Sequence, residues 1–152
     1  MKTCYLDANL LTFLGNKSSP FYQKALDIVD GLIKKEYGLV FSSLTLDEYF
    51  HAVIRFSLDT KPQTHQNLKK EYKKLLKLNI KLINPSLEEK KHLKVIDLMA
   101  KFNLHPRDAY HLFIMLENKV KFMATFDNDF NKVFLSGKIK KLNPAPVDRK
   151  KL

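Results

Sequence analysis

The sequence has no tryptophan, one cysteine, four scattered glycines and no long uninterrupted apolar run. The lone Cys4 excludes an intrachain disulfide and is typical of a reducing compartment; its place in an apolar run favours a small buried side chain. The glycines form neither a Walker A loop nor a G-x-G-x-x-G motif, so we expect no nucleotide cofactor. No run approaches the ~18 apolar residues of a membrane span, and Asp7 and Asn9 interrupt any signal-peptide pattern. We therefore expect a cytoplasmic protein that does not associate with membranes.

What the sequence does have is enough apolar content for one core and a large excess of positive charge. A length of 152 residues with 45% apolar content suits a single domain, which we expect over residues 1–146, followed by a short basic tail over residues 147–152. The net charge is +11, and between Lys61 and Lys94 ten lysines accompany only three acids. Such an excess favours an anionic partner, with nucleic acid and acidic lipid as the usual candidates. Any individual lysine can also simply solvate a helix face.

Short apolar runs alternate with helical patterns along the chain. We predict strands at residues 2–6, 38–43, 80–85 and 120–125, and a possible fifth at 137–143. Helical patterns fall between them: after Pro20 to near Gly38, and over 44–56, 65–78, 86–102 and from 106 onward. Ser86 and Glu89 have the spacing of a capping box. This alternation predicts βαβ units, and hence an α/β fold with a mostly parallel sheet covered on both faces.

Acidic residues follow the strand ends or open the helices after them: Asp7, Glu48, Asp108, Asp127 and Asp129. In a parallel sheet the carboxyl ends of the strands and the N-termini of the following helices share one edge, where ligands bind. Several carboxylates brought together repel one another, and a divalent cation relieves that repulsion. An all-oxygen ligand set favours Mg²⁺ or Mn²⁺.

Each of these acids also has a purely structural interpretation. Asp7 and Asp108 can cap helices, since Asp is a preferred residue at helix N-termini. Glu48 can be ordinary charge near a helix start, and Asp127 with Asp129 can shape a turn. It is their common place at the strand ends that favours a metal site.

Four motifs then resemble those of a known family. "YLDANLL", "SSLTLDEYFHAV", "LHPRDAYHLFIM" and "MATFDNDF" are similar, in this order and spacing, to the motifs of PIN-domain ribonucleases, especially the VapC-type toxins of toxin–antitoxin pairs. The resemblance implies a PIN-like three-layer α/β/α sandwich with about five strands. It also implies Mg²⁺- or Mn²⁺-dependent hydrolysis of single-stranded or looped RNA, a homodimer and a possible protein antitoxin as partner.

The resemblance also assigns roles by position. Asp7, Glu48, Asp108 and Asp127 match the family's catalytic, metal-binding quartet. Asp129 matches a second acid after the fourth strand and is included among the catalytic residues, with the roles of Asp127 and Asp129 left open. Asn9 and Thr125 match supporting residues. Beside Asp108, Arg107 is the basic residue that we place nearest the scissile phosphate.

Other functions remain open at this point. A stand-alone PIN-domain RNA-processing nuclease shares the same motifs. An aspartate-nucleophile phosphatase also places an Asp after its first strand, although such enzymes usually carry a second Asp where this chain has Asn9. A catalytically inactive RNA-binding module is a third alternative. The five histidines show no paired zinc spacing, and we expect His111 to pack or to hydrogen-bond locally.

Overall fold

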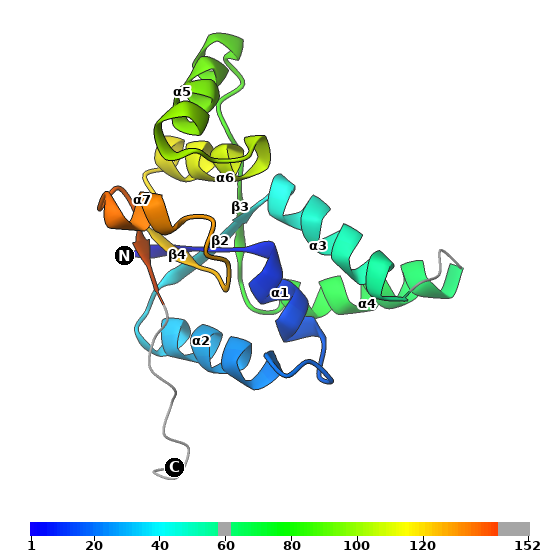
Figure 1. Ribbon diagram of the computed structural model, residues 1–152. Helices are drawn as coiled ribbons and strands as arrows, with labels where there is room; N and C mark the ends of the chain where they lie inside the picture. The colour runs from blue at the N-terminus through cyan, green and yellow to red at the C-terminus, as the bar shows by residue number, and fades with distance from the viewer. Residues whose placement is uncertain (58–61, 143–152) are drawn as a thin grey trace.

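A computed structural model describes residues 1–57 and 62–142, and its centre is a five-stranded sheet (Figure 1). The strand order is β3-β2-β1-β4-β5, and every neighbouring pair is parallel. The strands are β1 (Thr3–Leu6), β2 (Gly38–Ser42), β3 (Lys81–Ile83), β4 (Phe122–Ala124) and β5 (Lys140–Lys141). The predicted α/β class is therefore confirmed, and within the described ranges the sheet is parallel throughout.

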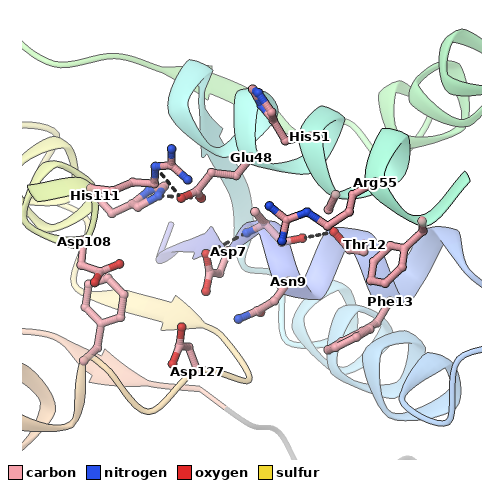
Figure 2. Close-up of a pocket in the computed structure, with 15 residues that line it drawn as sticks. Asp7, Asn9, Thr12, Phe13, Glu48, His51, Arg55, Asp108, His111 and Asp127 are labelled. Atoms are coloured by element: carbon pink, nitrogen blue, oxygen red, sulfur yellow. Dashed lines mark hydrogen bonds and ion pairs between the residues drawn. The ribbon is translucent and has the colours of Figure 1, made fainter. Parts of the chain in front are cut away.

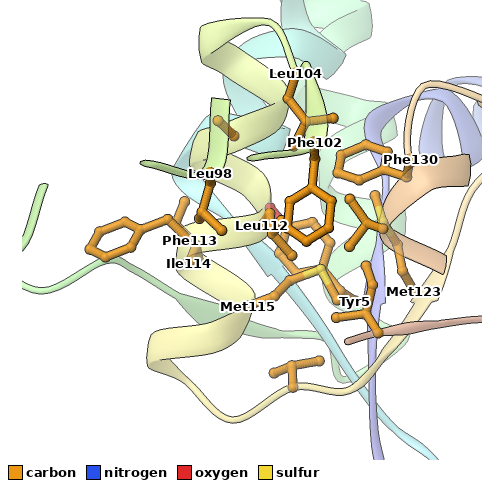
Figure 3. Close-up of a cluster of buried hydrophobic side chains, with 14 of the residues drawn as sticks. Tyr5, Leu98, Phe102, Leu104, Leu112, Phe113, Ile114, Met115, Met123 and Phe130 are labelled. Atoms are coloured by element: carbon orange, nitrogen blue, oxygen red, sulfur yellow. The ribbon is translucent and has the colours of Figure 1, made fainter. Parts of the chain in front are cut away.

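Alternate residues of the strands enter two separate cores, one on each face of the sheet. Tyr5 and Met123 belong to one core, which Figure 3 shows in close-up, whereas Cys4 and Leu6 belong to the other. This period of two follows from the pleat of a strand whose two faces are both covered. Burial raises the pKa of the Cys4 thiol to about 12, so Cys4 serves as an apolar side chain.

Helices cover both faces of the sheet, which gives the predicted three layers (Figure 1). One layer contains α5 (Leu93–Phe102), α6 (Pro106–Glu117) and α7 (Asn131–Leu135). The 3₁₀ helix η1 (Glu89–His92) directly precedes α5 in the chain. The other contains α1 (Ala8–Gly15), α2 (Tyr22–Lys34), α3 (Ser43–Ser57) and α4 (Pro62–Leu76). None of the described helices is both long enough and apolar enough to cross a membrane.

The sequence predictions are confirmed for the five strands, for the start of α2 after Pro20 and for the start of α6 at Pro106, but not for all helices. Helix α1 was not predicted, because it is short and buries Leu10 and Leu11 within an apolar run without a clear helical period. Helix α2 begins after Pro20, at Tyr22. The predicted boundary between domain and tail at residues 146 and 147 lies outside the described residues.

The predicted capping box at Ser86 is not formed. Ser86 Oγ accepts a hydrogen bond from the backbone N–H of Glu88 at 3.2 Å, two positions along the chain instead of three. The ring Nε2 of His92 lies 2.8 Å from the carbonyl oxygen of Ser86 and holds the segment in a tighter turn. The chain consequently passes through η1 before α5 begins.

Candidate metal centre

A pocket of about 350 Å³ lies at the carboxyl end of β1 (Figure 2). Its lining includes Asp7, Glu48, Asp108 and Asp127, which come from four separate segments of the chain. The chain leaves β1 towards β2 on one side and later adds β4 on the other, so β1 is where the strand order reverses. Ligands of parallel α/β sheets bind at this position. The sheet topology thus brings the four predicted acids to one pocket.

Asp7 directly follows β1 and is only 7% exposed. Its Oδ1 accepts the backbone N–H of Ala8 at 2.8 Å, so the capping interpretation is correct. Its Oδ2 accepts a hydrogen bond from the hydroxyl of Thr125. Burial nevertheless raises the pKa of Asp7, and the charge of Glu48 raises it further. Hydrogen bonds alone therefore do not compensate for the loss of water around this carboxyl group.

The hydroxyl of Thr125 connects three segments around the Asp7 carboxyl group. Thr125 Oγ1 donates to Asp7 and accepts from Asn9 Nδ2 at 3.2 Å and from the backbone N–H of Asp127 at 2.9 Å. Asn9 Oδ1 in turn accepts the backbone N–H of Phe126 at 3.2 Å. The end of β1, the start of α1 and the loop after β4 are fixed together. In this structure Asn9 and Thr125 hold the loop and the Asp7 carboxyl in place.

Glu48 lies on the second turn of α3 and makes two polar contacts from α6. Its Oε2 is 2.8 Å from His111 Nε2, and its Oε1 is 3.4 Å from Arg107 Nε (Figure 2). The Arg107 side chain is 60% exposed, which makes its ion pair a weak one. His111 is 1% exposed. The prediction that His111 packs is confirmed, since its ring is buried against that of Tyr5, but its hydrogen-bond partners are not local and come from α3 and β1.

Behind His111 lies a buried network of hydroxyl groups. His111 Nδ1 is 2.7 Å from the Tyr5 hydroxyl, which lies 2.6 Å from Ser42 Oγ and 2.8 Å from Thr45 Oγ1. Burial raises the pKa of Tyr5 above its usual range, so its hydroxyl remains a donor. One proton arrangement satisfies all the groups: Tyr5 donates to Nδ1, Ser42 and Thr45 donate to Tyr5, and Nε2–H donates to Glu48. His111 thus orients Glu48.

Asp108 occupies the first turn of α6 and is half-buried. Burial raises the pKa of Asp108, and the charges of Asp129, Asp127 and Glu48 raise it further, against a lowering effect of His111. The N-cap of α6 is His105, and no side chain caps this helix. Asp108 therefore makes no side-chain cap, although its place in the first turn is favourable for the helix dipole.

The two acids after β4 occupy different positions. Asp127 lines the pocket, and Figure 2 shows its carboxylate directed into it. Asp127 Oδ1 also accepts the backbone N–H groups of Asn128 at 2.6 Å and Asp129 at 3.1 Å, so the turn-shaping interpretation is correct for that oxygen. Asp129 is exposed and does not line the pocket. It acts on Asp108 through charge.

The donor set suits a hard divalent cation. Asp7, Glu48 and His111 each bring one possible ligand atom within 4.8 Å of the others. Both ring nitrogens of His111 are already hydrogen-bonded, which leaves the carboxylates as the better ligands. Oxygen donors favour Mg²⁺ or Mn²⁺, and a cation held by this group would offset the burial that raises the pKa of Asp7. Asp108 and Asp127 line the same pocket but do not belong to this group. The residues present therefore fit such an ion.

These features define a parallel α/β domain with a carboxylate-lined pocket where its strand order reverses. The chain belongs to the PIN-domain family, whose model matches residues 4–134. Among curated proteins, none is significantly similar to it in sequence.

Solved structures of toxin–antitoxin proteins share this fold. A crystal structure of Mycobacterium tuberculosis VapC20, described as a sarcin-ricin-loop-cleaving toxin, is 14% identical with a TM-score of 0.63, covering 86% of this chain and 95% of that one. FitAcB from Neisseria gonorrhoeae is 16% identical with a TM-score of 0.63 over 93% and 98% of the two chains. VapBC2 from Rickettsia felis, bound to a DNA fragment from its promoter, is 15% identical with a TM-score of 0.63 over 92% and 97%. At these identities the likeness shows the fold.

Sequence reasoning did not include Tyr5, Ser42, Thr45 or His111 in the site. Two spacings contained a usable signal. Thr45 precedes Glu48 by three residues and His111 follows Asp108 by three, which places each pair on one helix face. Tyr5 lies two residues before Asp7, so along an extended strand the two side chains point to the same face of the sheet. Nothing in the sequence, however, indicates that these three segments meet through one hydroxyl group.

The raised pKa of Asp7 predicts a stability gain for Asp7→Asn in metal-free protein. A folded-state pKa above the unfolded value of about 3.8 gives stability that is present at low pH and lost as pH rises through the folded pKa. Asn retains the helix cap but does not ionise. In EDTA at pH 8, we expect the midpoint temperature of thermal unfolding to be higher for Asp7→Asn than for the wild type. This difference should shrink towards pH 4. The exposed Asp47→Asn should show no such trend, and a less stable Asp7→Asn at pH 8 would contradict the assignment.

Removal of the Tyr5 hydroxyl should weaken both the fold and the cation site. Tyr5→Phe leaves the buried His111 Nδ1 without a partner and removes one hydrogen bond each from Ser42 and Thr45, which still bond to each other. We expect this to cost about 1–3 kcal/mol in urea unfolding followed by circular dichroism. Because His111 then loses its orientation, Mn²⁺ affinity measured by electron paramagnetic resonance should fall. Tyr110→Phe is the matched control, since Tyr110 also contacts a histidine, at 3.3 Å, away from this pocket. Unchanged Mn²⁺ affinity in Tyr5→Phe would show that the network does not orient Glu48.

Proposed function

We propose that this protein is a Mg²⁺- or Mn²⁺-dependent endoribonuclease that hydrolyses phosphodiester bonds of single-stranded or looped RNA. The observation that carries the proposal is the gathering of four carboxylates in one pocket around the buried Asp7. Membership of the PIN-domain family and the net charge of +11 support it. A positive surface suits a polyphosphate substrate.

Each residue has a part in this proposal. Asp7 and Asp108 would hold the cation directly, and Asp127 would do so directly or through water. Glu48, oriented by His111, would bind a second cation or accept a proton from the attacking water. When bound, Mg²⁺ or Mn²⁺ supplies an activated water and neutralises charge on the phosphate oxygens.

Three further residues would support the reaction. Through their hydrogen bonds, Asn9 and Thr125 would hold the Asp7 carboxyl and the loop that carries Asp127 at fixed positions relative to each other. Arg107 contacts Glu48 at 3.4 Å and is largely exposed, so its guanidinium can turn towards a bound phosphate. Asp129 would add negative charge near Asp108 without touching the cation.

Substitution of the pocket carboxylates tests the reaction. Protein purified free of host nucleases would be titrated with Mg²⁺ and Mn²⁺ on single-stranded, hairpin and duplex RNA and on a small phosphomonoester. We expect Asp7→Asn and Asp108→Asn to lose more activity than the roughly 10- to 100-fold that loss of an outer-shell partner costs.

Asp47→Asn serves as the control for Asp7→Asn and Asp108→Asn, because it makes the same change at an exposed carboxylate, which contacts His51 on the same helix. It should cleave RNA like the wild type. Full metal-dependent cleavage by Asp7→Asn would refute the assignment. Turnover of the phosphomonoester in preference to RNA would favour the phosphatase alternative.

We further propose that the protein is a toxin of the VapC type, acting as a homodimer and restrained by a protein antitoxin. The support is its fold, which it shares with VapC20 and with the FitAcB and VapBC2 structures. Induced expression in a bacterial host should then arrest growth, while Asp108→Asn should not. Co-expression of the adjacent open reading frame should relieve the arrest. Normal growth with active, soluble wild-type protein would favour a stand-alone processing nuclease.

A further inference from the structure

The acidic pocket extends beyond the carboxylates into an aromatic and basic end that the proposed chemistry does not use. This end lies between α1 and α3 and is lined by Thr12, Phe13, Ala52, Arg55 and Phe56. Phe56 is 67% exposed, although it lies in α3, whose other aromatic residues, Tyr49 and Phe50, are packed in the core. An exposed Phe ring contributes little buried apolar area to folding. Its place in the lining of a pocket instead indicates a contact with a ligand.

The second aromatic wall is held rigidly by its neighbours. The Phe13 ring lies 4.9 Å from that of Phe21 and 5.1 Å from that of Phe126, measured between ring centroids. Phe126 immediately precedes Asp127, and its backbone N–H is bonded to Asn9. The aromatic cluster is thereby tied to the segments that carry the carboxylates. A group bound against Phe13 would lie at a fixed position relative to the acidic end.

Positive charge accompanies these rings. Arg55 is exposed, and in Figure 2 its side chain extends from α3 back over α1 in the direction of Asp7. Lys24 Nζ lies 5.5 Å from the centre of the Phe126 ring. Flat apolar surfaces beside cations match a nucleic acid strand, in which bases stack on aromatic rings and phosphates pair with Arg or Lys. A cationic peptide attracted by the carboxylates would be repelled by Arg55 and Lys24.

We propose that the α1–α3 end of the pocket binds the base of an unpaired nucleotide next to the phosphate held at the acidic end. Phe56 and Phe13 provide the stacking surfaces, and Arg55 contacts the adjoining phosphate. The placement of the phosphate rests on the proposed nuclease function. The geometry admits a base only where it is free of a partner strand, because a paired base is already stacked within its helix. The preference for single-stranded or looped RNA then has its physical origin in this end of the pocket.

The test is a binding measurement that needs no cleavage. Fluorescence anisotropy of a labelled single-stranded oligoribonucleotide would be followed in protein carrying Asp7→Asn, with and without Phe56→Leu. One stacked base corresponds to roughly a tenfold change in affinity, so we expect Phe56→Leu to weaken binding by about that factor. An otherwise identical oligonucleotide series with one abasic position moved along the strand identifies the base concerned. At that position, the abasic strand should bind weakly and equally to both proteins.

Controls separate stacking from a general loss of fold or charge. Leu93→Ala changes another exposed apolar residue, 63% exposed, which lies outside this pocket, and should leave affinity unchanged. A fully paired duplex should not respond to Phe56→Leu. Equal weakening of intact and abasic strands at every position, or no weakening at all, would overturn the proposal. Because cleavage is not measured, a failure of the nuclease assignment would appear in the activity assay instead.

Discussion

The burial of the Asp7 carboxyl group is the constraint on which the rest of the site depends. The backbone N–H of Asp7 donates to the carbonyl of Ala124 at 3.1 Å, so the pairing of β1 with β4 continues to the first residue of the pocket. The sheet therefore fixes where this carboxyl lies, and it lies where water is largely excluded. Two hydrogen bonds stabilise its charge but leave the pKa raised. A cation in the pocket would offset that remaining cost.

Glu48 lies on α3, on one face of the sheet, but it is oriented by residues of the core on the other face. The ring of Tyr5 belongs to the hydrophobic cluster beneath α5 and α6, as Figure 3 shows, while its hydroxyl contacts His111. The packing of one core thus determines the position of a hydroxyl group, and through His111 the direction of a carboxylate at the pocket. Because buried polar groups are costly when unpaired, this network has few alternative arrangements. A change in the packing around Tyr5 would therefore also change the position of Glu48 at the pocket.

The sequence predicted the part of this structure that follows from topology. Runs of apolar residues identified the strands, and the rule for parallel sheets then brought Asp7, Glu48, Asp108 and Asp127 to one edge. It did not predict the hydroxyl network, because Tyr5 and its partners are 37 to 106 positions apart and only the folded chain decides which polar groups meet. The spacing of Ser86 and Glu89 likewise did not predict which backbone N–H the Ser86 hydroxyl would accept in the turn after β3.

For the proposed nuclease, the contrast between a basic protein and an acidic pocket would couple the binding of RNA to the binding of metal. At physiological ionic strength charges are screened over about 8 Å, so the surface lysines attract a strand but cannot shield its phosphate from nearby carboxylates. A phosphate entering the pocket without a cation would meet Asp7, Asp108 and Asp127 directly. Occupancy by Mg²⁺ or Mn²⁺ removes that repulsion, and by thermodynamic reciprocity a bound phosphate must strengthen the hold on the cation to the same degree. Stacking on the uncharged rings of Phe13 and Phe56 would add to the proposed RNA affinity without this electrostatic coupling, whereas a contact of Arg55 with the adjoining phosphate would depend on it.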